Sequence, residues 1–248
     1  RILMAEKKQL AAEKSIVNYG FFIGATPDNL EELNAVENVC GIKIFMGAST
    51  GDLLVDDPKT LESIFAKGTK LIAVHSEDES ILQANRILMK DINDVSIHSR
   101  IRDESAALSS TKLATRLSLK YNRRLHILHL TTAEECDLLR TLPREHQIST
   151  EVCPQHLVLT SPECYENLGT KAQMNPPIRS KRHKDALWQA LKDGIIDCIA
   201  TDHAPHTLAE KSQPYGISPS GMPGVETSLP LMLDRVNREL CTISEVVY

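Results

Sequence analysis

The chain has 248 residues, 42% of them hydrophobic, which is enough to bury the core of one large α/β domain. Its net charge of -5 and its 4% aromatic content exclude a basic, aromatic surface for nucleic acid. The apolar runs are as long as strands and too short to cross a membrane, and no signal-peptide pattern opens the chain. The six cysteines follow no C-x-x-C spacing, which predicts free thiols and a cytoplasmic location.

Apolar, β-branched runs alternate along the chain with helical patterns. A polar helix is expected from Met4 to Lys14, and the runs after it predict strands at 16–23, 41–46, 70–74, 124–130, 147–153 and 195–201. Hydrophobicity that is nearly continuous along a run is typical of parallel strands covered by helices on both faces.

Helix starts lie between these strands. Thr26-Pro27 and Asp57-Pro58 each offer an N-cap followed by proline at the first helical position. Thr132 and Glu135 have the spacing of a capping box. Further helices are expected over 181–192, where residues 186, 187, 190 and 191 form one apolar stripe, and from 225 and 242 onward.

Repeated strand–helix units predict an α/β fold, a (β/α)₈ barrel of the TIM type. Only six strands are recognisable in this sequence, whereas the complete barrel has eight. No repeat, linker or low-complexity tract is visible. We therefore expect one partial barrel domain over residues 1–248, truncated at both ends.

Four of the expected strands end in groups that suit catalysis or metal binding. Lys43, His75 and His129 stand at or near the ends of three of them, and Asp202 follows a fourth within the segment ATDHAPH. The carboxyl ends of barrel strands are where such folds carry their chemistry. The recurrence predicts an active site at this edge of the sheet.

Lys43 allows two interpretations. Its stem can pack in the strand while the ammonium reaches solvent. Alternatively, burial lowers its pKa, and the neutral amine reacts with carbon dioxide to give a carbamate that bridges two metal ions. The glycine-containing loop 47–51 that follows allows close backbone approach to a ligand.

A lone histidine at a strand end is as often structural as metal-binding, but two of them with an aspartate suit zinc. Strand alternation places His126 opposite His129, so only one of the two should enter the site. The remaining loop histidines are interpreted as surface residues or residues behind the site: His98, His146, His156 and His183.

Three other segments are ambiguous. Glu151 lies upstream of its strand end and is as readily structural. The segment 175–179 is either a proline-stiffened turn or a loop that orients substrate. The segment 220–224 either offers backbone amides to a polar ligand or forms a turn before a helix.

Together these residues resemble the amidohydrolase superfamily, and specifically the dihydroorotases. The resemblance covers nearly the whole chain and rests on GIKIFMGASTG (41–51), VHSED (74–78), HILHLT (126–131), EVCPQHL (151–157), NPPIR (175–179), ATDHAPH (200–206) and GMPGVET (221–227). NPPIR with ATDHAPH favours dihydroorotase, whereas the lysine and histidine strand ends are shared with hydantoinases, allantoinases and dihydropyrimidinases.

The resemblance implies a role for each matching residue. Lys43 matches a carboxylated lysine that bridges two zinc ions, and His75 and His129 match ligands of one of them. Asp202 matches the ligand that also shuttles a proton. Residues that match substrate-holding positions are Asn175, His206, Ser220 and Gly221.

One feature of the family is absent from this sequence. The family's first strand carries an H-x-H-x-R motif with two further metal ligands and a substrate-binding arginine, and its second strand ends in asparagine. Residues 1–248 contain neither. We expect that motif upstream of Arg1, and expect a chain without it to be a poor catalyst.

The predicted reaction is metal-assisted hydrolysis of a cyclic amide, in which Asp202 transfers a proton. For a dihydroorotase, N-carbamoyl-L-aspartate and L-dihydroorotate interconvert in pyrimidine biosynthesis. The alternatives are an allantoinase or hydantoinase, and an inactive scaffold for a partner such as aspartate transcarbamoylase. A small-molecule substrate is expected, with neither nucleic acid nor membrane, and the sequence is compatible with a homo-oligomer.

Overall fold

The computed structural model of the chain describes residues 2–49, 53–143 and 147–247. These residues form two compact units. Unit 1 is built from the described residues within 1–79, 109–128 and 143–149, and unit 2 from those within 80–108, 129–142 and 150–248. The single domain expected over residues 1–248 stays a prediction.

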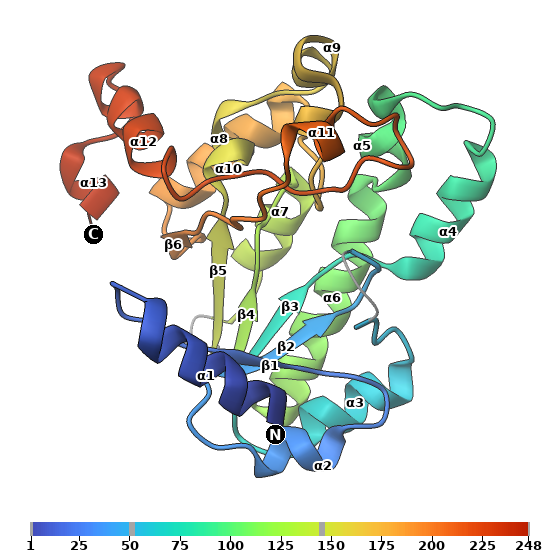
Figure 1. Ribbon diagram of the computed structural model, residues 1–248, viewed down its shortest axis with the longest axis vertical. Helices are drawn as coiled ribbons and strands as arrows, with labels where there is room; N and C mark the ends of the chain where they lie inside the picture. Colours follow the sequence, from blue (N-terminus) through green and yellow to red (C-terminus); the bar gives the residue numbers. More distant parts are fainter. Residues whose placement is uncertain (1, 50–52, 144–146, 248) are drawn as a thin grey trace. The chain divides into compact units, whose positions relative to one another are not determined.

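Unit 1 contains a parallel sheet. Strands β1 (Phe22–Gly24), β2 (Gly41–Phe45), β3 (Ile72–His75) and β4 (Leu125–Ile127) pair in that order (Figure 1). The ladder continues toward β5 (Ile148–Val152), because the amide of Leu125 donates to the carbonyl of Gln147 over 2.9 Å. The helices of this unit are α1 (Ile2–Lys14), α2 (Leu30–Ala35), α3 (Pro58–Ala66) and the part of α6 (Glu104–Tyr121) from residue 109 onward.

Burial in unit 1 follows the periods of strand and helix. In β2, Ile42 and Ile44 are buried while Lys43 and Phe45 are half-buried, as expected when alternate side chains point to opposite faces. In α3, the buried residues are Leu61, Ile64 and Phe65, whose spacing places them on one helical face. Helix α1 buries none of its described residues.

Unit 2 begins within β5, whose residue Glu151 pairs with Cys198 of β6 (Cys198–Ile199) in parallel. The strand order is therefore β1-β2-β3-β4-β5-β6. The helices of unit 2 are α4 (Glu79–Leu88), η1 (Val95–Ile97), α5 (His98–Ile101), the first turn of α6, α7 (Ala133–Arg140), α8 (Pro154–Val158), α9 (Glu163–Leu168), η2 (Gly169–Ala172), α10 (Lys181–Lys192), α11 (Leu208–Lys211), α12 (Ser228–Asn237) and α13 (Ile243–Val247).

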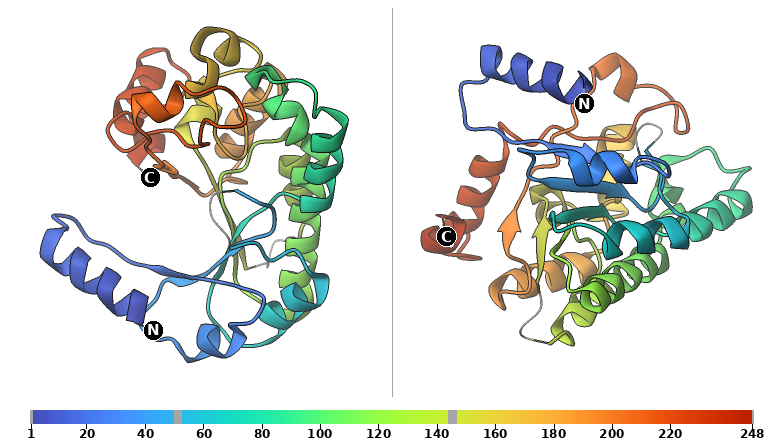
Figure 2. Two further views of the ribbon diagram at one scale, coloured as in Figure 1. Left: turned by 45° about the vertical axis from the view of Figure 1, so that its right-hand side comes forward. Right: turned by 90° about the horizontal axis from the view of Figure 1, so that it is seen from below.

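Two sets of contacts organise the helices of unit 2. Helix α10 packs against α7 and α8, and α12 contacts α8 and α13 (Figure 2). A separate cluster lies around α9 and η2, and it is formed by Val95, Cys164, Tyr165, Ala172, Met174 and Ile178. The aromatic ring of Tyr215 packs against this cluster.

The predicted α/β class with parallel strands is confirmed. Six parallel strands lie within the described ranges, whereas a closed barrel of this type has eight. The helix predicted over 181–192 is α10 with the same bounds, and its residues Leu187 and Ala190 are buried. Searching the described helices finds none that is both long and apolar enough to cross a membrane.

The strand predicted over 16–23 is wrong over residues 16–21. Only Phe22 and Ile23 of that range are paired, and the Ile16 side chain is 99% exposed. The hydroxyl of Ser15 donates to the carbonyl of Val17 over 2.8 Å and accepts from its amide over 3.3 Å. This local turn occupies the backbone groups that a strand would use in the sheet.

Helix starts were predicted with mixed success. Asp57 caps α3 as expected by accepting from the Thr60 amide over 2.8 Å, and the capping box of Thr132 and Glu135 is present. Thr26 does not begin a helix, because the Asn29 side chain accepts from its amide and donates to Gly24, and α2 starts only after this turn. The helix expected from 225 begins at Ser228.

The capping box of α7 gives a test of local stability. Thr132 is fully buried, and its hydroxyl donates to Glu135 Oε2 over 2.8 Å and accepts from the Glu135 amide over 3.1 Å. Thr132→Ser removes only the methyl group, whereas Thr132→Ala also removes the cap. We expect the alanine variant to be less stable than the serine variant by about 1 kcal/mol in urea unfolding. Equal unfolding midpoints would show that the cap contributes nothing.

Candidate functional site

Strands β2 and β3 place two of the predicted ligands on one face of unit 1, and Lys43 lies in the middle of β2 while His75 ends β3. Lys43 is paired with Ala73, and Phe45 with His75, so strand alternation puts all four side chains on the same face. The Lys43 ammonium nitrogen lies 4.4 Å from the centre of the Phe45 ring, and that ring lies 5.8 Å from the His75 ring. The lysine and histidine therefore converge across one aromatic side chain.

His75 has a buried acidic partner that the sequence analysis missed. Its Nε2 lies 2.8 Å from Oε2 of Glu77, and both side chains are buried. A carboxylate beside a histidine fixes the orientation of the ring, a common arrangement around metal ligands. The visible signal was the acid two residues after the histidine in V-H-S-E. Of the adjoining loop 47–51, residues 50 and 51 lie outside the described ranges.

In unit 2, the other two predicted ligands share an uncommon backbone conformation. His129 has a φ of 39° and Asp202 a φ of 43°, and neither is glycine. Both follow the end of a strand, β4 and β6 respectively. Such conformations are sparse for side chains other than asparagine and aspartate, and they cluster at functional sites. His129 is buried, while Asp202 is exposed.

The turn at His129 also limits the alternation argument that was made for His126. Strand β4 ends at Ile127, so alternation does not extend to residue 129. His126 lies within the strand in unit 1, where its Nδ1 is 2.8 Å from the hydroxyl of Ser149. Which of the two histidines enters the site remains a prediction.

The segment after Asp202 is joined to the segment 220–225 in unit 2. His206 Nε2 donates to the carbonyl of Ser220 over 3.2 Å, and His203 Nδ1 accepts from the amide of Gly224 over 3.0 Å. Gly221 has a φ of 142°, and a Cβ there would lie 2.5 Å from the carbonyl oxygen of Ala204. The structure thus brings together three predicted substrate-binding residues: His206, Ser220 and Gly221.

Asn175, the fourth predicted substrate-binding residue, is held by His98. His98 Nε2 lies 2.9 Å from the carbonyl of Met174 and 3.1 Å from Oδ1 of Asn175. A carbonyl only accepts, so Nε2 carries the proton, and Nδ1 accepts from the Tyr215 hydroxyl 3.1 Å away. His98 therefore fixes the orientation of the Asn175 side-chain amide.

Arg179, the last residue of the same loop, has a structural role. Its guanidinium is buried, donates to the hydroxyl of Thr131 over 3.2 Å, and also contacts the carbonyl of Arg102. The side chain of Arg179 therefore fixes the loop 175–179 through these hydrogen bonds. Asn175 of the same loop belongs to the candidate site.

Gln173 connects this loop with the segment 211–221. Its carbonyl accepts from Lys211 Nζ over 2.9 Å and from the amide of Gly221 over 3.0 Å. Its amide nitrogen donates to the carbonyl of Ser218 and the hydroxyl of Ser220, each over 3.0 Å. Burial lowers the pKa of Lys211 to about 8, so near pH 7 its ammonium is largely charged while it holds these carbonyls.

Of the two interpretations of the loop histidines, surface residues or residues behind the site, the first does not hold for three of them. His98, His156 and His183 are buried, because each finds a hydrogen-bond partner far along the chain. His183 Nδ1 accepts from the amide of Ala133, and its Nε2 donates to Glu104, whose pKa this contact lowers to about 2. His146 lies outside the described residues.

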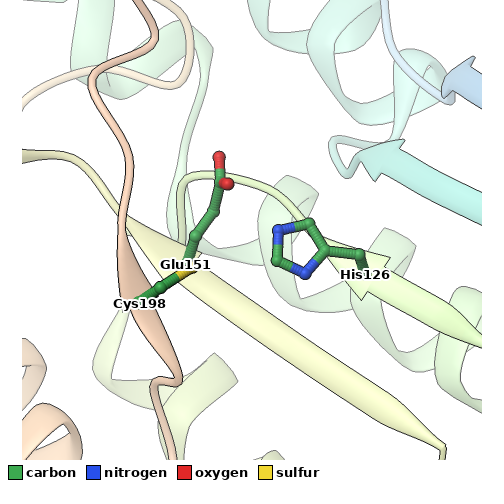
Figure 3. A group of neighbouring side chains, drawn as sticks. All are labelled: His126, Glu151 and Cys198. Atoms are coloured by element: carbon green, nitrogen blue, oxygen red, sulfur yellow. The ribbon is translucent and has the colours of Figure 1, made fainter. Parts of the chain in front are cut away.

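Glu151 and Cys198 face each other across β5 and β6 in unit 2 (Figure 3, which also labels His126). Burial raises the pKa of the Cys198 thiol, and the charges of Glu151 and Asp197 raise it further. A thiol that stays protonated is a poor metal ligand. The structural interpretation of Glu151 stays a prediction.

Comparisons with known proteins find similar sequences and a similar structure. The chain is 35% identical to a dihydroorotase of Methanosarcina acetivorans over 98% of its length, and 32% identical to an allantoinase of Streptomyces avermitilis over 97%. It spans only 54% and 55% of those two proteins. Its structure matches an L-hydantoinase (dihydropyrimidinase) from Arthrobacter aurescens with a TM-score of 0.92 and 26% identity, covering 98% of this chain and 56% of the other. No family model matches the chain.

Gly221 allows the junction between the two segments to be tested. Gly221→Ala combines an unfavourable φ with a clash against Ala204, whereas Gly194→Ala has a φ of 68° but open space around its new Cβ. We expect Gly194→Ala to cost about 1 kcal/mol and Gly221→Ala about 2 to 4 kcal/mol in urea unfolding, because overpacking adds to the backbone strain. Similar losses in both variants would remove the close approach as a constraint.

Proposed function

We propose that this chain, which belongs to the amidohydrolase family of the dihydroorotases and hydantoinases, is part of an enzyme that catalyses the reversible conversion of N-carbamoyl-L-aspartate to L-dihydroorotate. The observation that carries the proposal is the junction in unit 2, where the segment that contains Asp202 and His206 is hydrogen-bonded to the segment that contains Ser220 and Gly221. An acid and groups that can hold a ring thereby lie on two adjoining loops.

Metal binding is part of the proposal, and the donor set fits it. A lysine amine, two imidazoles and a carboxylate at strand ends match the oxygen and nitrogen ligands that zinc prefers, provided that Lys43 reacts with carbon dioxide to a carbamate and releases a proton. Lys43, His75, His129 and Asp202 would then hold two zinc ions. Bound zinc would lower the pKa of water and polarise a ring carbonyl.

The chain's own residues would supply the proton transfer and the substrate contacts. In ring opening, Asp202 would accept the proton of the attacking water and return it to the ring nitrogen as the C–N bond breaks. Asn175, whose side-chain oxygen is held by His98, would contact the ring. His206 would hold the ring carboxylate, and the backbone at Ser220 and Gly221 would contact the substrate.

A second candidate is favoured by the comparisons as well. The identity of the chain to an allantoinase is close to its identity to the dihydroorotase, so the alternative function is that of an allantoinase. The substrate ring of that alternative has no carboxylate. An inactive scaffold is disfavoured because all four proposed ligands are present in this sequence. The proposal includes a cytoplasmic location, since the six cysteines follow no disulfide spacing.

The substrate can be tested in the full-length protein that carries this sequence. Ring closure of N-carbamoyl-L-aspartate should proceed with kcat/KM at least about 100-fold above that for allantoin or hydantoin hydrolysis, because a site built for a carboxylate discriminates strongly against rings without one. Treatment with a chelator should abolish the activity, and added zinc should restore it. Faster hydrolysis of allantoin would replace the proposal by its alternative.

Rescue by short carboxylic acids should distinguish the role of Lys43 from that of Asp202. Lys43→Ala should lose bound zinc and activity, and short carboxylic acids should restore part of both by replacing the carbamate oxygens. Asp202→Asn should lower kcat by about 10²- to 10⁴-fold, as removal of a general acid–base group does, without rescue by such acids. Because both variants remove a proposed zinc ligand, the two are distinguished by kcat and zinc content measured with and without the carboxylic acid. Near-normal turnover of Lys43→Ala would contradict the bridging role.

A further inference from the structure

A cavity of about 370 Å³ lies within unit 2, beside two of the residues proposed to hold substrate. Asn175 and Ser220 form part of its wall. The other wall residues used below come from α4, from α5 and its C-terminal end, and from the loops after η2 and α11, and they are Arg86, His98, Arg102, Gln173, Tyr215 and Ser218. A cavity of this size accommodates a small polar molecule. We call it the arginine cavity.

The charge on the wall of the arginine cavity is positive. Arg86 and Arg102 belong to it, and no acidic side chain is among the described residues that line it. Burial raises the pKa of the Tyr215 hydroxyl, and the positive charges of Arg102 and Arg86 lower it in part. Guanidinium groups pair with carboxylates through two parallel hydrogen bonds. Two of them suit a ligand with two negative charges.

The wall also contains buried polar atoms that a ligand could satisfy. Within the described part of the chain, Oε1 of Gln173 and Oγ of Ser218 have no hydrogen-bond partner, although both residues are at least 95% buried. The Gln173 amide nitrogen is already used by Ser218 and Ser220. Its oxygen needs a donor, while the Ser218 hydroxyl can donate to an acceptor. The matching ligand therefore carries N–H groups as well as anionic oxygens.

The arginine cavity is connected to Asn175 through His98. The Tyr215 hydroxyl donates to His98 Nδ1, and His98 Nε2 engages the Asn175 oxygen. A ligand that contacts Tyr215 therefore acts on the residue that directs the Asn175 amide.

We propose that the arginine cavity binds the open-chain form of the substrate, a ureido compound with two carboxylates, through Arg86 and Arg102. The choice of this ligand rests on the proposed function, since N-carbamoyl-L-aspartate has both the ureido N–H groups and the two charges. The cyclic form has one carboxylate fewer, so the cavity favours the open-chain partner of the reaction.

The test is binding to the full-length protein after removal of metal, so that turnover plays no part. Isothermal titration should show N-carbamoyl-L-aspartate binding at least about 10-fold more tightly than N-carbamoyl-β-alanine, which has the ureido group but one carboxylate, because a hydrogen-bonded charge pair is worth about that factor. Equal affinities would overturn the two-arginine argument.

Three variants locate the binding. Arg86→Gln should weaken N-carbamoyl-L-aspartate by about 10-fold and remove the preference over the one-carboxylate probe, since it removes one charge pair. Lys90→Gln, an exposed lysine just after α4, removes the same charge and should change nothing. Tyr215→Phe should weaken binding by about 3-fold and provides a second measurement if Arg86→Gln does not fold.

Other outcomes separate this inference from the proposed function. Binding that Lys43→Ala abolishes and Arg86→Gln leaves intact would place the ligand at the proposed metal ligands and overturn the cavity assignment. Turnover of N-carbamoyl-L-aspartate without any effect of Arg86→Gln on affinity would refute the inference and leave the proposed function in place. Dianion binding that depends on Arg86, in a protein without turnover, would support the cavity and refute the reaction.

Discussion

Parallel strand pairing is the constraint on which the candidate site depends. Because neighbouring strands run in the same direction, the residues that end them reach the same edge of the sheet. The register between β2 and β3 then decides which side chains share a face, and it puts Lys43 and His75 on the same one. A slip of one residue would send either side chain to the opposite face and separate the pair.

After the strands end, backbone conformation rather than strand pairing positions the candidate residues. His129 and Asp202 both turn the chain into the left-handed region within three residues of the ends of their strands. This conformation is uncommon for residues other than glycine, although it is less rare for aspartate and histidine than for most. At Gly221 the absence of a side chain lets the loop after Asp202 and the segment 220–225 approach each other. The loops of unit 2 are thus shaped by three positions whose conformations are all unusual.

The sequence predicts those features whose cause is local. The cap at Asp57, the capping box of α7 and the bounds of α10 each depend on residues within a few positions of one another. Lys43 and His75 were found because an ionisable group within an apolar run, or directly at its end, stands out. The same local reasoning failed at residues 16–17, where a serine side chain offers the backbone an alternative that hydropathy does not register.

Features that depend on distant partners could not be predicted in this way. His183 stands in a polar segment, yet it is buried against Glu104, which lies 79 positions away. His98 looks like a loop residue until Met174 and Tyr215 are placed beside it. The arginine cavity is likewise assembled from α4, α5 and two later loops, and no spacing along the chain indicates that they meet.

The hydrogen bonds of Gln173 bear on the thermodynamics of any ligand in unit 2. Backbone and side chain of this one residue hold Lys211, Ser218, Ser220 and Gly221, so the segment that would contact a ligand is ordered before the ligand arrives. Ordering a mobile loop on binding costs conformational entropy that lowers affinity. Since that ordering is already present here, little loop entropy would be lost, and affinity would depend mainly on how well the polar groups match.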